Sequence, residues 1–274
     1  MNMRTLLCIF MLFSSSMFFG CTHSTNNNNS TAPKIFHADF EEGSLDKGAL
    51  DNWSYLLNPQ GIEIISEDEL KKESKLSVYA GRHAAKITIK NSDDFLWNGA
   101  DYLNRSELQY APASAVEGGK TRISFAFMLP TLFTNSRHDF AYWESNQSYQ
   151  QIMRFNLIGK TMSFQMSNAD VKLWSFDQLQ PGTWYKVDML VKWSSSEHGV
   201  DKTTQQGQQP GAIKVWLDNQ LVVDEKNIKT LVANEQAFFQ IGILRDKQTL
   251  DEVIYLDEVI EYSLVDKYIE TSNL

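Results

Sequence analysis

The sequence predicts an all-β fold built from two sheets, as in a β-sandwich or jelly roll. From Lys34 onward, apolar and polar residues alternate with a period of two in many short runs. Turn residues separate these runs, and only one short segment has a helical pattern. Many short strands without alternating helices favour a two-sheet sandwich over an α/β fold. We therefore expect one β domain over residues 35–274, with 42% apolar residues in the chain to fill its core.

The clearest strands are predicted for residues 122–129 and 185–193. The first run ends at Pro130, which cannot continue a ladder of backbone hydrogen bonds. Its two faces consist of Ile123, Phe125, Phe127 and Leu129 on one side and of Arg122, Ser124 and Ala126 on the other. The apolar face of the second run consists of Tyr185, Val187, Met189, Val191 and Trp193. Each strand is expected to turn one face toward the core.

Four further segments complete the expected elements. GAIKVWLDNQLVVD (211–224) predicts two strands joined by a tight turn at Asp218 and Asn219. FFQIGILR (238–245) and EVIYLDEVIEY (252–262) predict two more strands near the C-terminus. SEDELKKESK (66–75) predicts a short helix, because Ser66 can cap it and acidic residues favour its first turn.

The N-terminus has the pattern of a secretory signal peptide over residues 1–20. Arg4 is its only charge, and the apolar run LLCIFMLF is too short to span a membrane. Gly20 directly before Cys21 indicates cleavage by a lipoprotein signal peptidase and lipidation of Cys21, although Phe18 stands where Leu is more usual. The alternative is an ordinary signal peptide with a coincidental cysteine. Residues 21–34 are rich in Asn, Ser and Thr and predict a flexible tether.

These features predict a lipid-anchored protein of the bacterial cell envelope, and Thr22 is compatible with the outer membrane. Cys8 is removed with the signal peptide and Cys21 accepts the lipid, so the mature domain has no thiol for a disulfide or a metal site. The formal charge of the chain is −9, and loss of Arg4 makes it one unit more negative. This charge argues against a nucleic-acid partner, and against any polyanion unless a local basic cleft binds it.

The order of the segments resembles that of a known family. The segments that carry the resemblance are DFEEGSL, GRHAAKITI, NRSELQY, ISFAFMLP, LQPGTWYKVDMLVKWS, GAIKVWLDNQLVV, FFQIGILRD and IYLDEVIEY. In this order they resemble the heparin lyase I-like and glucuronan lyase-like polysaccharide lyases, and NRSELQ is also similar to a strand of alginate lyases. The resemblance covers nearly the whole domain and implies a concanavalin A-like jelly roll whose concave sheet holds an acidic polysaccharide. It also implies cleavage of uronic-acid linkages by β-elimination.

β-Elimination sets chemical requirements that do not depend on the family. A proton must leave C5 of the uronate, so the enzyme must neutralise the adjacent carboxylate, for which arginine, glutamine or asparagine is suited. A base must take this proton and an acid must supply one to the leaving oxygen, commonly histidine or tyrosine.

NRSELQY is the best candidate for the centre of such a site. Arg105, Glu107 and Gln109 fall on one face of the predicted strand, with Ser106 and Leu108 on the other. Arg105 could bind a uronate carboxylate, Glu107 could hold Arg105 in place, and Gln109 could hydrogen-bond the same carboxylate. The alternative is an ion pair on an exposed sheet face without a functional role.

The base is harder to assign. Of the five histidines, His23 lies in the tether, His198 in a polar loop and His37 in the first strand, which leaves His83 and His138. Residues 136–155 align with a family stretch in which a Gln-Trp-His motif often provides the catalytic histidine. Here Glu144 follows Trp143. The resemblance therefore leaves His138, Tyr142 or Tyr149 in that role, or an altered or absent activity.

A second departure lies in FFQIGILR. Related lyases carry a lysine and a catalytic tyrosine where this chain has Gln240 and Leu244. Arg245 and Arg154 could still supply positive charge, although each alone is more often a solvated strand residue. The expected catalytic residues are Arg105, Gln109, His138, Tyr142 and Tyr149. The expected substrate-binding residues are Glu107, Trp143, Glu144, Arg154, Gln240 and Arg245.

The tryptophans and scattered carboxylates have two interpretations each. Trp143 and Trp97 lie in polar surroundings and are candidates for stacking on sugars, whereas the strand patterns place Trp184, Trp193 and Trp216 in the core. No cofactor is required by the sequence, but a calcium ion could bind if Glu41 or Glu42 meets Asp257.

Three functional classes remain open. The first is a polysaccharide lyase, and the second is a non-catalytic glycan-binding lipoprotein on the same fold, which the missing His and Tyr would favour. The third is a glycoside hydrolase, which would need two carboxylates facing one bond. Phosphate loops, zinc-ligand spacings and serine elbows are not found in the sequence.

Overall fold

The computed structural model describes residues 34–43, 53–97, 100–111, 115–167, 171–196 and 209–263. The predicted signal peptide, Cys21 and the tether up to residue 33 lie outside these ranges, as do His23 and His198. Lipidation of Cys21 and export therefore stay predictions. No helix within the described ranges is long and apolar enough to cross a membrane.

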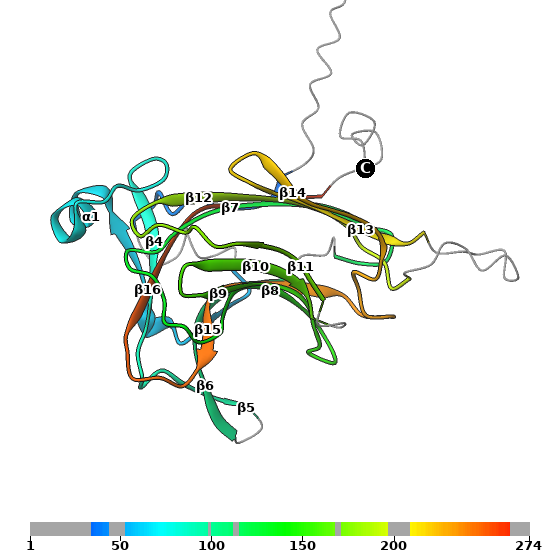
Figure 1. Ribbon diagram of the computed structural model, residues 1–274, viewed down its shortest axis with the longest axis horizontal. Coiled ribbons are helices and arrows are strands. Elements are labelled where there is room, and N and C mark those ends of the chain that lie inside the picture. The colour runs from blue at the N-terminus through cyan, green and yellow to red at the C-terminus, as the bar shows by residue number, and fades with distance from the viewer. Residues whose placement is uncertain are drawn as a thin grey trace, which may run out of the picture. The chain divides into compact units, whose positions relative to one another are not determined.

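Two antiparallel sheets are stacked on one another, which confirms the predicted all-β jelly roll (Figure 1). The β7 sheet consists, in spatial order, of β14 (Gln220–Ile228), β13 (Gly211–Leu217), β12 (Trp184–Lys192), β7 (Lys120–Met128), β16 (Glu252–Ser263), β4 (His83–Ile89) and β3 (Ile62–Ser66), with β1 (Lys34–Ala38) also paired to β16. The β15 sheet consists of β11 (Val171–Phe176), β10 (Thr161–Met166), β9 (Gln151–Ile158), β8 (His138–Ser145), β15 (Ala237–Asp246), β6 (Ala100–Tyr110) and β2 (Tyr55–Leu57), with β5 (Asp94–Trp97) also paired to β6.

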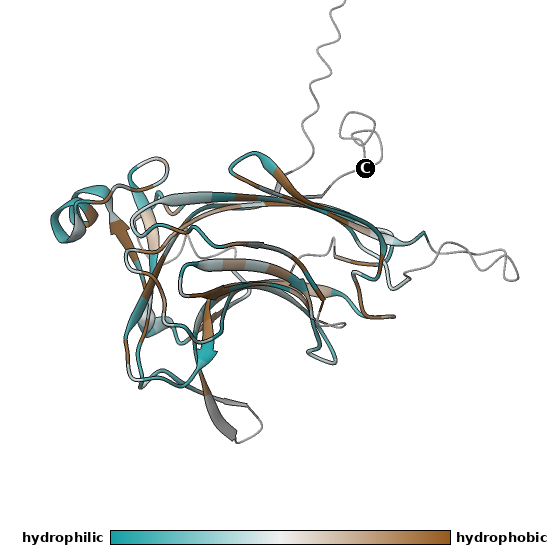
Figure 2. Ribbon diagram, viewed as in Figure 1, coloured by the Kyte–Doolittle hydropathy of each residue, from teal (hydrophilic) through white to brown (hydrophobic). Residues whose placement is uncertain are grey.

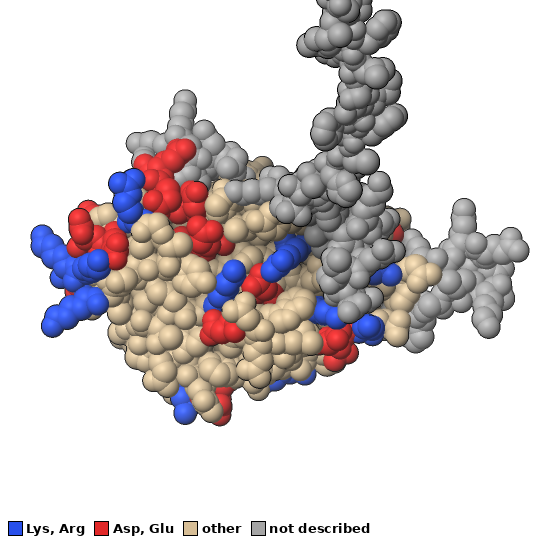
Figure 3. Space-filling view, turned by 90° about the horizontal axis from the view of Figure 1, so that it is seen from above, with Lys and Arg blue, Asp and Glu red and all other residues tan. Residues whose placement is uncertain are grey.

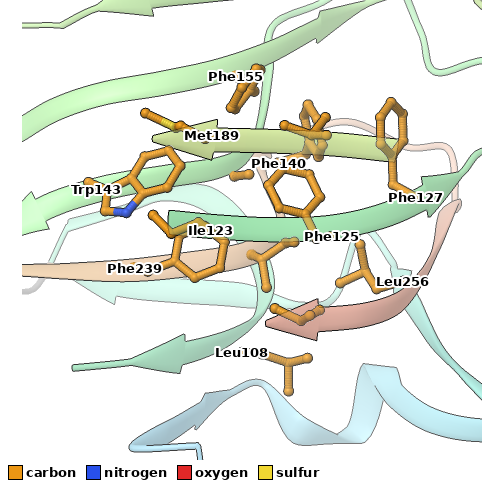
Figure 4. Packing of buried hydrophobic residues seen from close by; sticks show 14 of the residues in the cluster. Leu108, Ile123, Phe125, Phe127, Phe140, Trp143, Phe155, Met189, Phe239 and Leu256 are labelled. Atoms are coloured by element: carbon orange, nitrogen blue, oxygen red, sulfur yellow. The ribbon is translucent and has the colours of Figure 1, made fainter. Parts of the chain in front are cut away.

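The core lies between the sheets and is rich in aromatic rings. Hydrophobic and hydrophilic residues both occur along the strands of the two sheets (Figure 2). Phe125 of β7 lies against Phe140 and Phe155 of the opposite sheet, with ring centroids 6.2 and 6.1 Å apart (Figure 4). Trp193 is buried as predicted, whereas Trp184 and Trp216 are only half-buried. Interdigitation of large rings from both sheets fixes the spacing of the two layers.

Local signals in the sequence are confirmed at the one α-helix and at the hairpin. Helix α1 (Glu67–Ser74) begins with a capping box in which Ser66 and Glu69 bond each other's backbone, and a short 3-10 helix (Pro59–Gly61) precedes β3. Between β13 and β14, Asp218 and Asn219 both have positive φ, the conformation that a two-residue hairpin turn requires.

Acidic and basic side chains are interspersed on the side of the protein seen from above, where the outer face of the β7 sheet lies (Figure 3). One such pair on this face joins Nη2 of Arg122 on β7 to Oδ1 of Asp188 on β12 at 2.9 Å. The charges of this face largely offset one another locally. The described part of this face therefore lacks the extended basic surface that would attract a polyanion.

Irregular pairing in the middle of the β15 sheet decides which side chains face outward. The register shifts between Ile241 and Leu244 where β15 pairs β8, and between Asp139 and Ala141 where β8 pairs β9. Phe140 lies at this β-bulge and points into the core. As a result, residues on the two sides of Phe140 do not follow one continuous alternation.

Candidate active site

A row of mostly polar side chains crosses the outer face of the β15 sheet. Pairing register places them side by side in the order Tyr55, Gln109, Gln240, Tyr142, Arg154, Gln165 and Lys172. Directly paired residues of antiparallel strands share a face, and the adjacent residues Leu108, Ile241 and Trp143 are buried in the core. Six strand-to-strand steps of about 4.8 Å make the row about 29 Å long, several times the width of one sugar ring.

Arg105 of β6 lies beside this row and joins three strands. Its Nε donates to Oε2 of Glu107 at 2.5 Å, and its Nη2 donates to Oε1 of Gln240 at 2.5 Å and to the hydroxyl of Tyr142 at 2.8 Å. Arg105 is 8% exposed and Glu107 is fully buried. A guanidinium bound on several sides keeps one orientation, so its charge is held at a defined place on the sheet face.

Burial and the local charges shift the pKa values of this cluster. Burial lowers the pKa of Arg105, but the charge and hydrogen bond of Glu107, together with the other acidic groups nearby, outweigh burial and raise it above its ordinary value. Burial raises the pKa of Glu107, and the charge of Arg105 opposes that shift. Burial and the nearby Glu107 carboxylate raise the pKa of Tyr142 well above 10. Arg105 stays positive and Tyr142 stays protonated across the physiological pH range.

Glu144 lies two residues beyond Tyr142 on β8 and is half-buried. Its Oε2 accepts a hydrogen bond from Nε2 of Gln240 at 2.9 Å. The pKa of Glu144 is raised to about 7. Burial is the largest cause and the nearby Glu107 adds to it, whereas the charge of Arg105 opposes the rise. Glu144 is therefore a carboxyl group that exchanges protons near neutral pH, on the same face as Arg105.

Gly242 makes room for the Arg105 cluster. It pairs with Glu107 across β15 and β6, and its φ is +148°. A Cβ atom built on Gly242 would lie 2.8 Å from Cα of Glu107, and closer still to the carbonyl oxygen of Ser106. Only a residue without a side chain fits here, so Gly242 determines how closely β15 approaches the strand that carries Arg105.

We expect Gly242→Ala to lower the free energy of unfolding by about 1–3 kcal/mol, because the added methyl group overlaps backbone atoms of β6. Chemical denaturation followed by tryptophan fluorescence would measure this loss. Gly118→Ala is the matched control, since Gly118 also has positive φ but nothing lies within 4 Å of its added Cβ. Equal losses in the two variants would show that space at Gly242 is unimportant.

A second polar network borders the row and was not anticipated from the sequence. Asp139 of β8 is buried and accepts from Nη2 of Arg137 at 2.5 Å and from Nε2 of Gln151 at 3.2 Å. Nη1 of Arg154 donates to Oε1 of Gln151 at 2.6 Å, and its Nη2 donates to Oε1 of Gln165 at 3.0 Å. Alternation along β9 and β10 is the signal that could have pointed to Gln165. Arg154 thus lies on the outer face, and its expected role in substrate binding stays a prediction.

Two exposed aromatic side chains lie in or near the row. Tyr55 is 65% exposed and pairs with Gln109, but the three-residue strand β2 carries no clear sequence pattern, so Tyr55 was missed. Tyr149, a predicted catalytic residue, is 51% exposed and lies against Phe238 with ring centroids 6.3 Å apart. Its φ of +54° is unusual for a tyrosine. Both rings can offer a face or a hydroxyl to a sugar.

Three of the predicted site residues point away from this face. His138 is fully buried, and its Nε2 lies 2.6 Å from Oε2 of Glu252. Nη1 of Arg245 donates to the same carboxylate oxygen at 2.5 Å, also in the interior. Trp143 stacks on Phe239 in the core, with ring centroids 4.9 Å apart. We exclude His138, Arg245 and Trp143 from the candidate site because substrate cannot reach them.

The remaining expectations concern Trp97, Leu244 and a calcium ion. Trp97 ends β5, but its side chain lies outside the described part of the structure. Leu244 pairs with Arg105 and Asp139 on the outer face, so an apolar group occupies the place of the expected tyrosine.

Glu41 and Asp257 both bond the backbone between Ala80 and His83, but Glu42 has no described contact to them. Among the described side chains, no group of three or more His, Cys, Asp or Glu could hold a metal ion. Calcium binding stays an untested expectation.

Fold and site together define a carbohydrate-active jelly-roll protein, with a long polar row and a fixed arginine on one sheet face. The chain belongs to the polysaccharide lyase family, because the sequence model of that family, described as "Polysaccharide lyase", matches residues 45–260. This range contains every residue of the row and of the Arg105 cluster. The resemblance inferred from the order of the segments is thereby confirmed.

Solved structures show the same fold at low sequence identity. An endo-β-1,4-glucuronan lyase from the fungus Trichoderma reesei is 16% identical, with a TM-score of 0.60 over 85% of this chain and 96% of that chain. An alginate lyase of polysaccharide lyase family 7 is 14% identical, with a TM-score of 0.52 over 79% of this chain and 96% of that chain. A GH131 β-glucanase catalytic domain from Podospora anserina is 15% identical, with a TM-score of 0.50 over 84% and 93%. No curated protein matches the sequence.

Proposed function

We propose that this protein cleaves a uronic-acid-containing polysaccharide by β-elimination. The observation that carries the proposal is Arg105, whose guanidinium is held on the outer sheet face beside the amide of Gln240. β-Elimination removes the proton at C5, and negative charge then develops on the adjacent carboxylate. A positive charge fixed beside an amide donor is suited to bind that carboxylate and to stabilise the developing charge.

Gln109 adds a second amide to this binding region. It pairs with Gln240 across β6 and β15, so both side chains lie on the outer face. Within the described residues its side-chain amide makes no hydrogen bond, unlike that of Gln240. Gln109 can therefore donate to the substrate without losing a contact inside the protein.

The length and charge of the row support a polymeric, acidic substrate. Arg154 and Lys172 continue the row beyond Tyr142, and Arg137 lies at its border. These cations provide local positive charge in a chain whose formal charge is −9. Two of the similar structures are a glucuronan lyase and an alginate lyase, and both polymers are built from uronic acids, which favours the same class of substrate.

The test is cleavage of a panel of polymers, namely alginate, glucuronan, heparin and chondroitin, each beside its carboxyl-reduced counterpart. β-Elimination creates a double bond conjugated to the carboxylate, and this product absorbs ultraviolet light. We expect absorbance to rise with at least one acidic polymer and not with its reduced counterpart, because the reduced sugar lacks the group that makes the C5 proton acidic.

Two results would contradict the proposal. New reducing ends without ultraviolet absorbance would indicate a glycoside hydrolase. Binding of a polymer without any new chain ends would indicate a glycan-binding protein, for which the apolar Leu244 in place of a tyrosine would be a physical reason.

A further inference from the structure

We infer that Glu144 is the acid–base group of this site. Its carboxylate takes the C5 proton of the bound uronate and then returns that proton to the O4 atom of the leaving sugar. This inference rests on the proposed β-elimination and adds a residue to it. The histidine and tyrosine that the resemblance leads one to expect are replaced by Glu144 and Leu244, so another group has to do this work.

The position of Glu144 is set by one amide that also contacts Arg105. Gln240 accepts from Nη2 of Arg105 through Oε1 and donates to Oε2 of Glu144 through Nε2. The two ends of one side chain therefore hold the carboxylate of Glu144 next to the guanidinium. The hydrogen bond from Gln240 is the one described for Glu144, which leaves the other carboxylate oxygen, Oε1, available to a ligand. A uronate whose carboxylate binds Arg105 would therefore lie on the sheet face that carries Glu144.

The charged groups around Glu144 suit this role. On β6 they are Arg105 and Glu107, and on β8 it is Asp139, while the Tyr142 hydroxyl on the same strand stays neutral. Across the two flanking strands, Glu144 pairs with the uncharged Phe238 and Gln151, and Arg154 pairs with Tyr142, two residues from Glu144 along β8. Burial and the two other carboxylates raise the pKa of Glu144 and Arg105 lowers it, with a result of about 7. A base with such a pKa is half deprotonated at neutral pH and stronger than an ordinary carboxylate.

The proposed step is balanced without a further reactant. The electron pair of the C5–H bond forms the double bond between C4 and C5 as the bond from C4 to O4 breaks. The proton passes first to Glu144 and then to O4, which leaves as a hydroxyl group. Glu144 is a carboxylate again after the step, ready for the next one.

Other groups near Glu144 fit the role less well. Tyr142 is fully buried, its hydroxyl accepts from Arg105, and burial raises its pKa well above 10. Leu244 is apolar. Tyr149 is the remaining candidate for donating the proton to O4, since its ring lies against Phe238, the partner of Glu144 across β15 and β8. Its contribution can be tested separately.

One group can serve both atoms only if the C5 proton and O4 lie on the same side of the sugar ring. This is so in D-glucuronate and D-mannuronate, and not in their C5 epimers L-iduronate and L-guluronate. The inference therefore predicts faster cleavage of glucuronate or mannuronate linkages than of linkages to their epimers.

The test uses the acidic polymer that the wild-type protein cleaves. We expect Glu144→Gln to lower kcat/KM at least about 10²-fold while polymer binding and thermal stability are kept. Wild-type kcat/KM should rise with pH and reach half its maximum near pH 7, because the carboxylate is the active form. Gln240→Lys would place a positive charge beside Glu144, lower its pKa, and move this midpoint to lower pH. Glu225→Gln, a half-buried glutamate on β14, is the matched control and should change neither property.

The outcomes separate this inference from the proposed function. If the wild-type protein produces ultraviolet-absorbing product and Glu144→Gln does so equally fast with the same pH profile, Glu144 is not the acid–base group, although the lyase activity stands. If Tyr149→Phe loses as much activity as Glu144→Gln, the return of the proton by Glu144 is overturned. If the wild-type protein cleaves no acidic polymer, the proposed function fails and the inference fails with it.

Discussion

Replacing Arg105 with glutamine is expected to lower kcat/KM on the cleaved polymer by about 10²–10³-fold, the usual effect of removing one group that stabilises developing negative charge. The loss should fall mainly on kcat, because the carboxylate carries more charge in the transition state than in the bound substrate. Steady-state kinetics from the ultraviolet absorbance of the product would measure the effect.

Two variants make this experiment specific. Arg105→Gln alone leaves the buried Glu107 without its ion-pair partner, so the double variant Arg105→Gln/Glu107→Gln should be compared in a thermal unfolding assay. Arg122→Gln removes an ion pair between a more exposed arginine and Asp188 from the outer face of the other sheet and should leave kcat/KM unchanged. A folded Arg105 variant with wild-type kcat/KM would remove Arg105 from the site.

Replacing Glu252 with glutamine is expected to destabilise the protein by about 3–5 kcal/mol, because the buried guanidinium of Arg245 would lose its carboxylate partner. Oε2 of Glu252 accepts from Arg245, and Nε2 of the fully buried His138 lies 2.6 Å from it. Nε and Nη2 of Arg245 are buried without a hydrogen-bond partner within the described residues, so Glu252 is its main compensation. Denaturant titration of the variant would measure the change in unfolding free energy.

Glu252 also gives this prediction a pH dependence. Burial raises its pKa, but the hydrogen bonds from His138 and from the backbone of Thr134 outweigh burial and lower the pKa to about 2. A depressed pKa contributes stability above the ordinary value of 4.5, and that contribution is lost as pH falls toward 2. The variant should therefore differ most from the wild-type protein at neutral pH and least in strong acid. The pair of the exposed Glu63 with the half-buried Lys86 provides the control, since Glu63→Gln should cost less than about 1 kcal/mol at any pH.

The site departs from the related lyases in a consistent way. Gln240 replaces a lysine, Glu144 replaces a histidine and Leu244 replaces a tyrosine at positions that the resemblance aligns. A lysine at position 240 would pair with the carboxylate of Glu144 and lower its pKa. With glutamine there, the carboxylate is held by a neutral amide and keeps a raised pKa. The replacements at 144 and 240 therefore fit together electrostatically.

Most of the fold could be predicted from the sequence, because its signals are local. Alternation of apolar residues identified β7 and β12, and two residues suited to positive φ identified the turn between β13 and β14. The capping residues of α1 lie three positions apart, so they too can be recognised in one stretch of chain. Alternation along β6 likewise placed Arg105 and Glu107 on one face.

The orientation of His138 could not be predicted, because it depends on how neighbouring strands pair. Strict alternation along β8 would put His138 on the same face as Tyr142 and Glu144. The β-bulge at Phe140 adds a residue to β8 relative to β9, so His138 points into the core while Tyr142 and Glu144 point outward. No local pattern marks this bulge, and the polar surroundings of Trp143 in the sequence likewise hid its burial.

The sequence by itself determined the fold class, the family and the strand that carries Arg105, since each depends on patterns within short segments or on their order. Only the tertiary structure decided that Gln240 joins Arg105 to Glu144, and that His138 and Arg245 belong to a buried network around Glu252 instead. The physical reason is that hydrogen bonding, burial and pKa depend on residues far apart in the chain, whose distance is set by strand register and by bulges.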